Sequence, residues 1–428
     1  MIFIILSDFG GWFEGQLNWQ RYNDWNLFNE KNYSEIGLIN KLPKGIETYT
    51  SISTTPEIYF KRMHISFSGS FYNIAIFKAE DRHWFESPVL NLVSTEKLRD
   101  ESWGANAEGM RIDLWNKRYA SGFLLSRYNV NEKGECFVFD LKKYSGMINF
   151  GFLFIEKNFI TGVNDVFSPR FSVSKKPFDF KFEYAISNHT YYPDSLNYSY
   201  AAEMKIIPLG AFFITMKHYN FGLNFRDEVS NDFNSFNLSN FGKKGVFFDI
   251  SFLVPRRAFT ITEKFSFENL NRRWSYTEIY IEFINNVFFK SYFDVTKDKY
   301  GDIWKHLFFE ISTESKRGKI KLQYKIKDIG VKNVEYSMGE RHLFGIEGKM
   351  NITDEIGFYS RIGIGNSKKG VWETGFYQLS FRPFSNSEIY LEYGEGSHTD
   401  GDIVNDSDFA DREIRTIERL RLILKYYF

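Results

Sequence analysis

Apolar and polar residues alternate with a period of two along much of this chain. At its end, one set of alternate positions reads Leu420, Leu422, Leu424, Tyr426 and Phe428, and the other reads Arg419, Arg421, Ile423, Lys425 and Tyr427. Successive side chains of a strand point to opposite sides, so this pattern predicts a strand with one apolar and one mostly polar face. The alternation recurs over 178–187, where the polar set begins Asp179, Lys181 and Glu183, and over 319–327, where it includes Lys319, Lys321, Lys325 and Lys327.

The connections between these expected strands alternate between short and long. Short ones carry turn residues, as in Ser174–Pro177, Asn285–Asn286 and Ser315–Gly318. The long ones are expected at 81–108, 157–167, 188–195, 220–243, 328–340 and 394–412. An antiparallel up-and-down barrel requires such an order, and we expect an even number of strands, about 22 from residue 45 onward with a range of about 18 to 24.

Composition indicates that this barrel lies in a membrane. The chain has 428 residues, including 47 Phe, 26 Tyr and 9 Trp, yet no run of about 18 apolar residues that a transmembrane helix would need. In hydrocarbon every backbone polar group must be paired within the protein, and a closed barrel achieves this. We therefore predict an all-β, closed antiparallel up-and-down transmembrane β-barrel over residues 45–428, surrounded by the lipids of a bacterial outer membrane.

Residues 1–44 follow the alternation less well. The apolar start over 1–6, followed by Ser7, is similar to the end of a secretory signal, and Trp12, Trp19 and Trp25 then stand among Asn and Gln residues. Three interpretations stay open for this segment: a signal remnant, an extra hairpin of the barrel, or a plug inside its lumen.

The last nine residues resemble the C-terminal assembly signal of bacterial outer-membrane β-barrel proteins, which ends in Phe after alternate apolar or aromatic residues. The positions that match are Leu420, Leu422, Leu424, Tyr426 and Phe428. The resemblance implies an outer-membrane location and recognition by the barrel-assembly machinery. It implies nothing about the function of the barrel.

A weaker resemblance covers roughly residues 57–190. It is carried by Ser66–Gly69, Tyr72–Ile76, Gly104–Asn106, Tyr119–Leu124, Gly162–Asp165 and Tyr184–Ser187. These segments are similar to barrels that follow a carbohydrate-binding module in Gram-negative proteins. No such module is recognisable in the 428 residues, so the resemblance implies the barrel and not the sugar binding of the module.

Charge and motifs exclude several functions. The 54 basic and 54 acidic residues balance, which argues against a nucleic-acid partner. A single cysteine, Cys136, forms no internal disulfide, and the histidines lack ligand spacing, so we expect no cofactor. No motif of an enzyme is present. An acidic stretch with Asp400, Asp402, Asp406 and Asp408 is a weak candidate for Ca²⁺, with an ordinary solvated loop as the better interpretation.

The predicted function is a pore for small hydrophilic solutes. Its candidate lining residues are the inward charges Asp179, Lys181, Glu183, Lys319, Lys321, Lys325, Lys327, Arg419, Arg421 and Lys425. These charges either line water or pair with one another across the lumen. The alternative is an outer-membrane glycan-binding surface protein or an enzyme built on the long loops.

The terminal strand yields a test of location. If it is an assembly signal, deletion of Phe428 or the substitution Phe428→Asp should markedly reduce insertion into the outer membrane. Heat-modifiable migration of the membrane fraction on gels measures the inserted protein. Wild-type levels in both variants would contradict the assignment of the signal.

Overall fold

In the computed structural model, the structure describes most of the chain between Asp8 and Phe428. The described ranges are 8–21, 25–27, 33–42, 45–53, 59–78, 85, 90, 92, 107–130, 132–159, 162–189, 198–207, 211–222, 244–254, 259–268, 271–297, 301–331, 339–394, 403–405 and 418–428. Within these ranges no helix is both long and apolar enough to cross a membrane.

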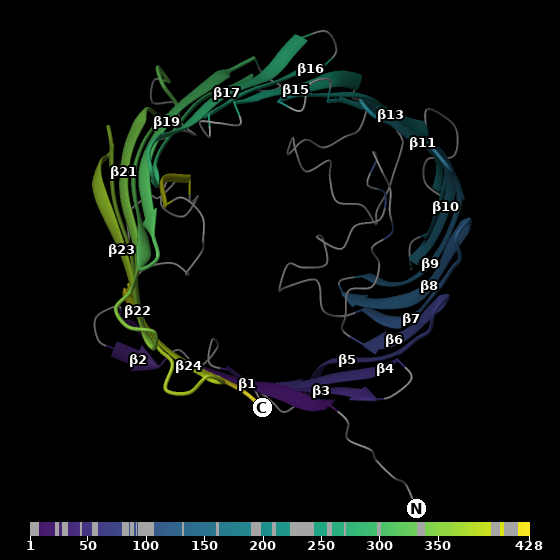
Figure 1. The fold of residues 1–428 in the computed structure, drawn as a ribbon, viewed down its shortest axis with the longest axis horizontal. Coiled ribbons are helices and arrows are strands. Elements are labelled where there is room, and N and C mark those ends of the chain that lie inside the picture. The colour runs from purple at the N-terminus through teal and green to yellow at the C-terminus, as the bar shows by residue number, and fades with distance from the viewer. Residues whose placement is uncertain are drawn as a thin grey trace, which may run out of the picture.

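The strands form one closed antiparallel ring (Figure 1). The first half comprises β1 (Asp8–Arg21), β2 (Trp25–Leu27), β3 (Tyr33–Leu42), β4 (Ile46–Ser53), β5 (Tyr59–Ser68), β6 (Tyr72–Lys78), β7 (Ala107–Trp115), β8 (Tyr119–Val130), β9 (Glu132–Ser145), β10 (Ile148–Phe159), β11 (Gly162–Lys175) and β12 (Phe178–His189). The second half comprises β13 (Tyr198–Ile206), β14 (Phe212–Phe221), β15 (Lys244–Val254), β16 (Phe259–Glu268), β17 (Asn271–Ile284), β18 (Val287–Lys297), β19 (Ile303–Ser315), β20 (Gly318–Lys327), β21 (Arg341–Asn351), β22 (Ile356–Ser367), β23 (Gly370–Phe381), β24 (Ser387–Gly394) and β25 (Glu418–Tyr427). From β3 to β25 each strand pairs with the next along the chain, and β1 pairs with β3 and with β25 to close the ring.

The ring has 24 strand positions, because β2 and β3 share one. The segment Asp8–Gln16 of β1 pairs with β3, and Trp19–Arg21 pairs with β2, while the other edge of β1 is occupied by β25. The predicted fold class is confirmed. The 22 strands expected from residue 45 onward correspond to β4 through β25.

The described residues 8–21, 25–27 and 33–42 therefore belong to the wall. Of the three interpretations kept for residues 1–44, the extra hairpin describes β1 with β2 and β3, whereas a lumen plug does not. Residues 1–7 lie outside the described part of the chain. The predicted boundary between residues 44 and 45 therefore lies within one continuous barrel.

The two rims of the barrel differ in the length of their connections. At the rim that holds both Asp8 and Phe428, here called the terminal rim, every connection spans two to five residues. Positive φ angles of 66° at Asn286 and 63° at Gly146 allow two of the tightest of these turns. At the opposite rim, the connections include 79–106, 222–243, 328–340 and 395–417. The expected long connection at 157–167 is wrong, because β10 and β11 continue until only residues 160–161 separate them.

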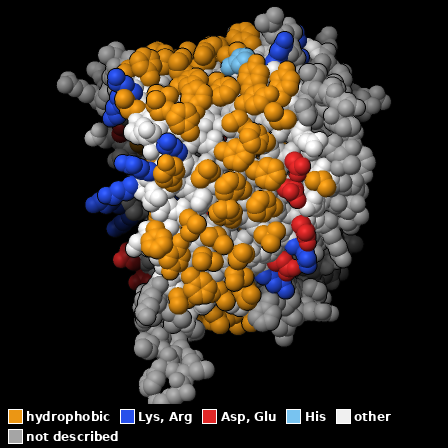
Figure 2. Space-filling model, turned by 90° about the vertical axis from the view of Figure 1, so that its right-hand side faces the viewer, with side chains coloured by type: hydrophobic (Ala, Val, Ile, Leu, Met, Phe, Trp, Pro, Cys, Tyr) orange, Lys and Arg blue, Asp and Glu red, His pale blue; other side chains and the backbone are white. Residues whose placement is uncertain are grey.

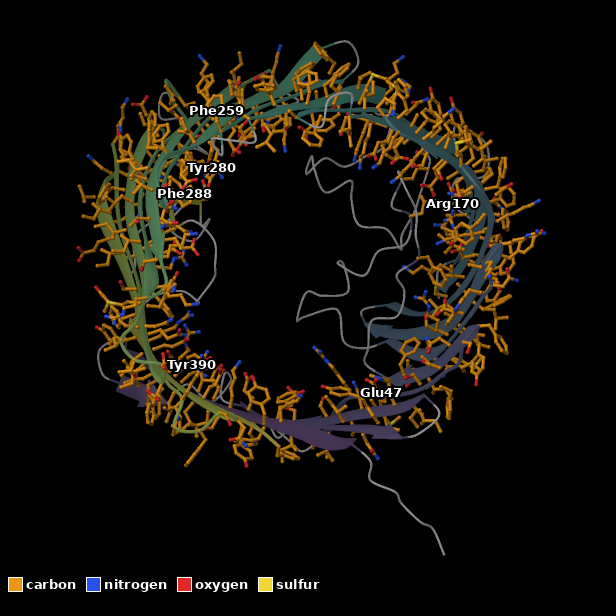
Figure 3. The ribbon with its side chains drawn as sticks, in the orientation of Figure 1. Glu47, Arg170, Phe259, Tyr280, Phe288 and Tyr390 are labelled. Atoms are coloured by element: carbon orange, nitrogen blue, oxygen red, sulfur yellow. The ribbon has the colours of Figure 1, made fainter. Side chains whose placement is uncertain are left out.

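The period-two alternation produces two chemically different faces. Outward positions carry exposed apolar residues such as Phe150, Leu322 and Leu424, and the space-filling view shows a broad apolar surface (Figure 2). Inward positions carry polar and charged side chains, among them Arg170 (Figure 3). Aromatic pairs such as Tyr184 with Tyr198, and Tyr426 with Phe428, stack along the outer face. An outward apolar face against lipid is what a transmembrane barrel requires.

The difference between the rims predicts the orientation in the membrane. Barrels of this kind keep short turns on the periplasmic side, so single cysteines at Ser397 and Asn231 should react with an impermeant maleimide on intact cells, and one at Asn286 should not. Each variant is made with Cys136→Ser, so that only the introduced thiol reports. Labelling of Asn286→Cys alone would reverse the topology.

Candidate functional site: the lumen wall

The ten predicted lining residues all occupy inward positions. The three predicted residues on β12, Asp179, Lys181 and Glu183, lie on the same face as the buried Ala185. The four predicted lysines on β20 lie on the same face as the buried Gln323. The three from β25 lie opposite inward residues of β24, including Glu388 and Glu392. Strand pleating alone thus placed these residues on the lumen side of the wall.

Several of the basic residues in this set pair with carboxylates on neighbouring strands. Lys321 Nζ lies 3.5 Å from Glu347 Oε1, Arg421 Nε lies 2.8 Å from Glu392 Oε2, and Lys425 Nζ lies 3.1 Å from Glu14 Oε2. Lys319 is more exposed and lies 3.7 Å from Glu314. The wall is therefore charged yet largely neutralised within itself, rather than uniformly basic. The acidic partners Glu14, Glu347 and Glu392 lie on strands outside the predicted set, and the alternation along those strands places them on the inner face.

Two further ion-pair networks line the wall at β9–β14. Arg170 on β11 pairs with Asp140 on β9, and Lys142 lies 3.6 Å from the same carboxylate. On β13, Glu203 contacts Lys205 at 3.1 Å and Lys217 at 2.9 Å. Such lateral pairs hold side chains flat against the wall, and their partly buried settings strengthen the attraction relative to exposed pairs.

One segment of the β24–β25 connection folds into the barrel. The 3-10 turn η4 (Ile403–Asn405) lies inside the ring beside β19 and β21 (Figure 1). Ile403 and Val404 are buried against Phe308 and Leu343, and Tyr292 and Trp372 pack around them. Full burial of aliphatic side chains of this size stabilises by about 1.5–3 kcal/mol each. We call the residues Ile403–Asn405 the latch.

Polar contacts fix the end of the latch. Asn405 Oδ1 accepts hydrogen bonds from Lys325 Nζ at 2.7 Å and from Tyr292 Oη at 2.8 Å. Lys325, one of the predicted lining residues, is thereby covered and 9% exposed. Space for the latch comes from Gly345, where a Cβ atom would lie 2.2 Å from Ile403 Cγ2. The sequence alone offered no signal for this contact, because it joins residues from distant strands.

A second segment, in the β6–β7 connection, covers the opposite part of the wall. Phe85, Leu90 and Leu92 are buried in an apolar cluster with inward residues of β8–β14, including Leu124, Val138, Ile155 and Cys136. The Arg111 guanidinium lies 4.3 Å above the Phe85 ring.

The same segment also contacts a predicted lining residue. Glu183 Oε2 accepts the backbone N–H of Leu90 at 2.9 Å, and Glu183 Oε1 accepts from Ser168 Oγ at 3.1 Å. Glu183 is fully buried in this contact and does not face open water.

Charged residues also secure the β20–β21 connection at the opposite rim. Arg341 pairs with Asp328 inside the wall, and the Asp328 backbone N–H donates to His306 Nδ1 at 3.2 Å. The Gly330 backbone N–H donates to Glu340 Oε2 at 2.9 Å and holds the pKa of that carboxyl below its ordinary value. This connection is thus held at both of its ends.

No metal centre is found among the residues that the structure describes, since no three His, Cys, Asp or Glu side chains converge there. The Ca²⁺ candidates Asp400, Asp402, Asp406 and Asp408 lie outside the described residues. The candidate assembly signal lies on the outer face of β25, and its last residue exchanges backbone hydrogen bonds with Gly11 on β1 at 2.7 and 3.0 Å. Its role as a signal stays a prediction.

Comparison with known proteins supports the assignment of the fold. No protein-family model and no curated protein sequence matches the chain. Among solved structures, a chain of the E. coli P pilus tip assembly intermediate PapC-PapD-PapK-PapG is similar with a TM-score of 0.59 and 8% identity, over 97% of this chain and 60% of that chain. The P pilus usher (PapC) translocation pore has a TM-score of 0.49 and 6% identity over 98% and 99% of the chains. The siderophore receptor PirA from Pseudomonas aeruginosa has a TM-score of 0.44 and 8% identity over 98% and 80%.

The closed ring, its apolar exterior and the likeness at a TM-score of 0.59 define the class: the protein is a transmembrane β-barrel of the outer-membrane type. Within that class it is a 24-stranded barrel with two segments folded against its inner wall.

The latch yields a test that depends only on its packing. Gly345→Val should detach Ile403–Asn405, because the new side chain would occupy the position of Ile403. Asn405→Leu should do so by removing a hydrogen bond from a charged amine, which is worth about 1.5–3 kcal/mol or a roughly 10- to 100-fold population change. Trypsin cleavage at Arg412 and Arg415 in the purified barrel should accelerate accordingly.

The matched control is Gly348→Val on the same strand, whose side chain points to the outer face. Its cleavage rate should equal that of the wild type. Equal cleavage in all four proteins would show that the latch does not hold the connection in place.

Proposed function

We propose that the protein is an outer-membrane channel for small hydrophilic solutes, with a lumen narrowed by the latch and by the segment around Phe85–Leu92. The observation that carries the proposal is the chemistry of the inner wall. Outside the two apolar clusters, many of its described side chains are polar and pair sideways along the wall, as in Arg421 with Glu392. A polar wall of this kind favours water in contact with it.

The size of the ring supports this proposal. About eight strands make a barrel that side chains can fill, whereas barrels of about 16 to 18 strands leave an aqueous channel, and still larger ones hold a plug. With 24 positions the wall alone cannot fill its interior. The described in-folded segments cover two parts of the wall, at β8–β14 and at β18–β23.

The proposed partners are small hydrophilic solutes, outer-membrane lipids and the barrel-assembly machinery. No chemical reaction is proposed. The lipid-facing residues of β25, such as Leu424 and Phe428, are 40% and 46% exposed and therefore accessible to lipid and to assembly factors.

Ion conductance in a planar bilayer tests the proposal. The wild-type protein should conduct, and the double variant Lys319→Glu, Lys349→Glu should shift the reversal potential toward cation selectivity. These two lysines are directly opposite each other on β20 and β21. Glu314, 3.7 Å from Lys319, is 62% exposed, so it neutralises their charge only weakly. Lys143→Glu, on the outer face, should leave the reversal potential unchanged.

Two outcomes would contradict the channel. One is an equal reversal potential in wild type and double variant. The other is the absence of conductance in both the wild type and Gly345→Val, since release of the latch should widen any aqueous path. Removal of residues 1–44 is not a suitable test, because it would delete two wall strands and open the ring.

A further inference from the structure

A recess of about 580 Å³ lies in the inner wall near the terminal rim, where β21 to β25 meet. The in-folded segments do not occupy it: its lining comes from strand residues and from the turn between β21 and β22. Volumes of 300–1,000 Å³ are typical of sites for small molecules. The residues that matter most for its chemistry are Tyr390, Ile423, Glu392, Arg421, Gln378 and Lys425.

The floor of the recess is a small apolar platform. Tyr390 on β24 and Ile423 on β25 are directly opposite each other and both are half-buried, with Tyr390 on the inner layer of side chains (Figure 3). Ile423 interrupts the inward series of Arg419, Arg421 and Lys425. A strand that is otherwise polar on this face therefore presents an apolar residue beside an aromatic ring.

Rows of neutralised charges lie on both sides of this platform. Toward the opposite rim, Glu392 accepts a hydrogen bond from Gln378 Nε2 at 2.6 Å and pairs with Arg421. Toward the terminal rim, Lys425 pairs with Glu14 and lies 5.9 Å from the centre of the Tyr390 ring.

On that same side, Glu388 accepts from Tyr390 Oη at 2.6 Å and from Arg382 Nε at 3.1 Å. Each charged group thus has a partner and is fixed in orientation. Of these groups, Arg382, Glu392, Arg421 and Lys425 line the recess.

This arrangement favours one class of solute. A sugar ring has an apolar C–H face that can lie on Tyr390 and Ile423, and a rim of hydroxyl groups that can both donate and accept. Carboxylate and guanidinium groups flanking the platform can bind adjacent hydroxyls in bidentate fashion. A small ion would have to compete with the existing ion pairs, and an apolar solute would cover these polar groups without forming hydrogen bonds to them.

We propose that this recess binds a neutral oligosaccharide at the periplasmic mouth of the lumen. Passage of the sugar through the barrel requires the channel proposed above. Binding of the sugar in the recess does not require that channel. The aromatic platform supplies contact area, and the flanking pairs supply orientation. Binding should be weak enough for release, with affinity dominated by the Tyr390 ring.

The test uses the full-length barrel purified in detergent, with maltotriose as the probe and isothermal titration calorimetry as the measurement. Wild type should bind, and Tyr390→Ala should weaken binding by about tenfold, as expected for loss of a buried aromatic contact. Tyr390→Phe keeps the platform and should bind within about threefold of wild type. Ile423→Ser is a second variant that removes the apolar floor while sparing the ring.

Tyr280→Ala is the matched control. Tyr280 is another inward tyrosine with a lysine, Lys290, opposite it on the next strand, but it packs on Phe288 and lies outside the recess. Its substitution should leave maltotriose binding unchanged. Heat-modifiable migration verifies that each variant is folded.

Three results would overturn the proposal: no maltotriose binding by folded wild type, equal losses in Tyr390→Ala and Tyr280→Ala, or equal binding of a polyethylene glycol of similar mass. Conductance without sugar binding would leave the channel in place and remove the recess as a site. Sugar binding that depends on Tyr390, in a protein that does not conduct, would support the site and remove the channel.

Discussion

The pairing of every backbone polar group is the constraint on which the rest of this structure depends. Lipid offers no hydrogen bonds, so a sheet inside a membrane must have no free edge. The closing pair of β1 with β25 meets this requirement by joining residues 12–21 to residues 418–427. Once the ring is closed, each strand has one face toward lipid and one toward the lumen, and the chemistry of both faces follows from alternate positions in the sequence.

The inner face carries many charged side chains, but its net electrostatic field is weak because neighbouring charges of opposite sign offset each other. Pairs such as Lys321 with Glu347 and Lys425 with Glu14 link adjacent strands, so charges that would repel or attract solutes are balanced locally. The two in-folded segments are held by different chemistry. The segment with Phe85 joins a large apolar cluster, whereas the latch rests on two aliphatic side chains and on Asn405. The latch is therefore the more readily displaced of the two.

The fold was predictable because its main signal is local. Alternation over 178–187, 319–327 and 419–428 predicted which side chains face inward, and turn residues predicted short connections such as those at 285–286 and 315–318. Residues 8–42 were harder to interpret, since β2 and β3 share one position and the alternation is interrupted between them. The connection at 157–167 was misjudged because polar residues such as Glu156 and Asp165 continue paired strands.

The candidate site was predictable only in part. Inward charges follow from pleating, but their partners require the register between strands, as for Arg421 with Glu392. The latch could not be predicted, because Gly345 and Ile403 are distant in sequence and meet only in the closed ring. Ile423 is recognisable in the sequence as an apolar residue within a polar series. Its part in the recess follows from the register, which places Tyr390 directly opposite it.

The seam between the first and last strands has a consequence for how the molecule forms. All other wall contacts join segments that are neighbours in the chain, but this one joins its two ends, which gives it by far the highest contact order in the protein. Because this pairing closes the longest loop of the chain, we expect it to form late in folding. Until then β1 presents an unpaired edge that can accept a strand from another chain, so survival of the unfinished barrel depends on that edge being shielded.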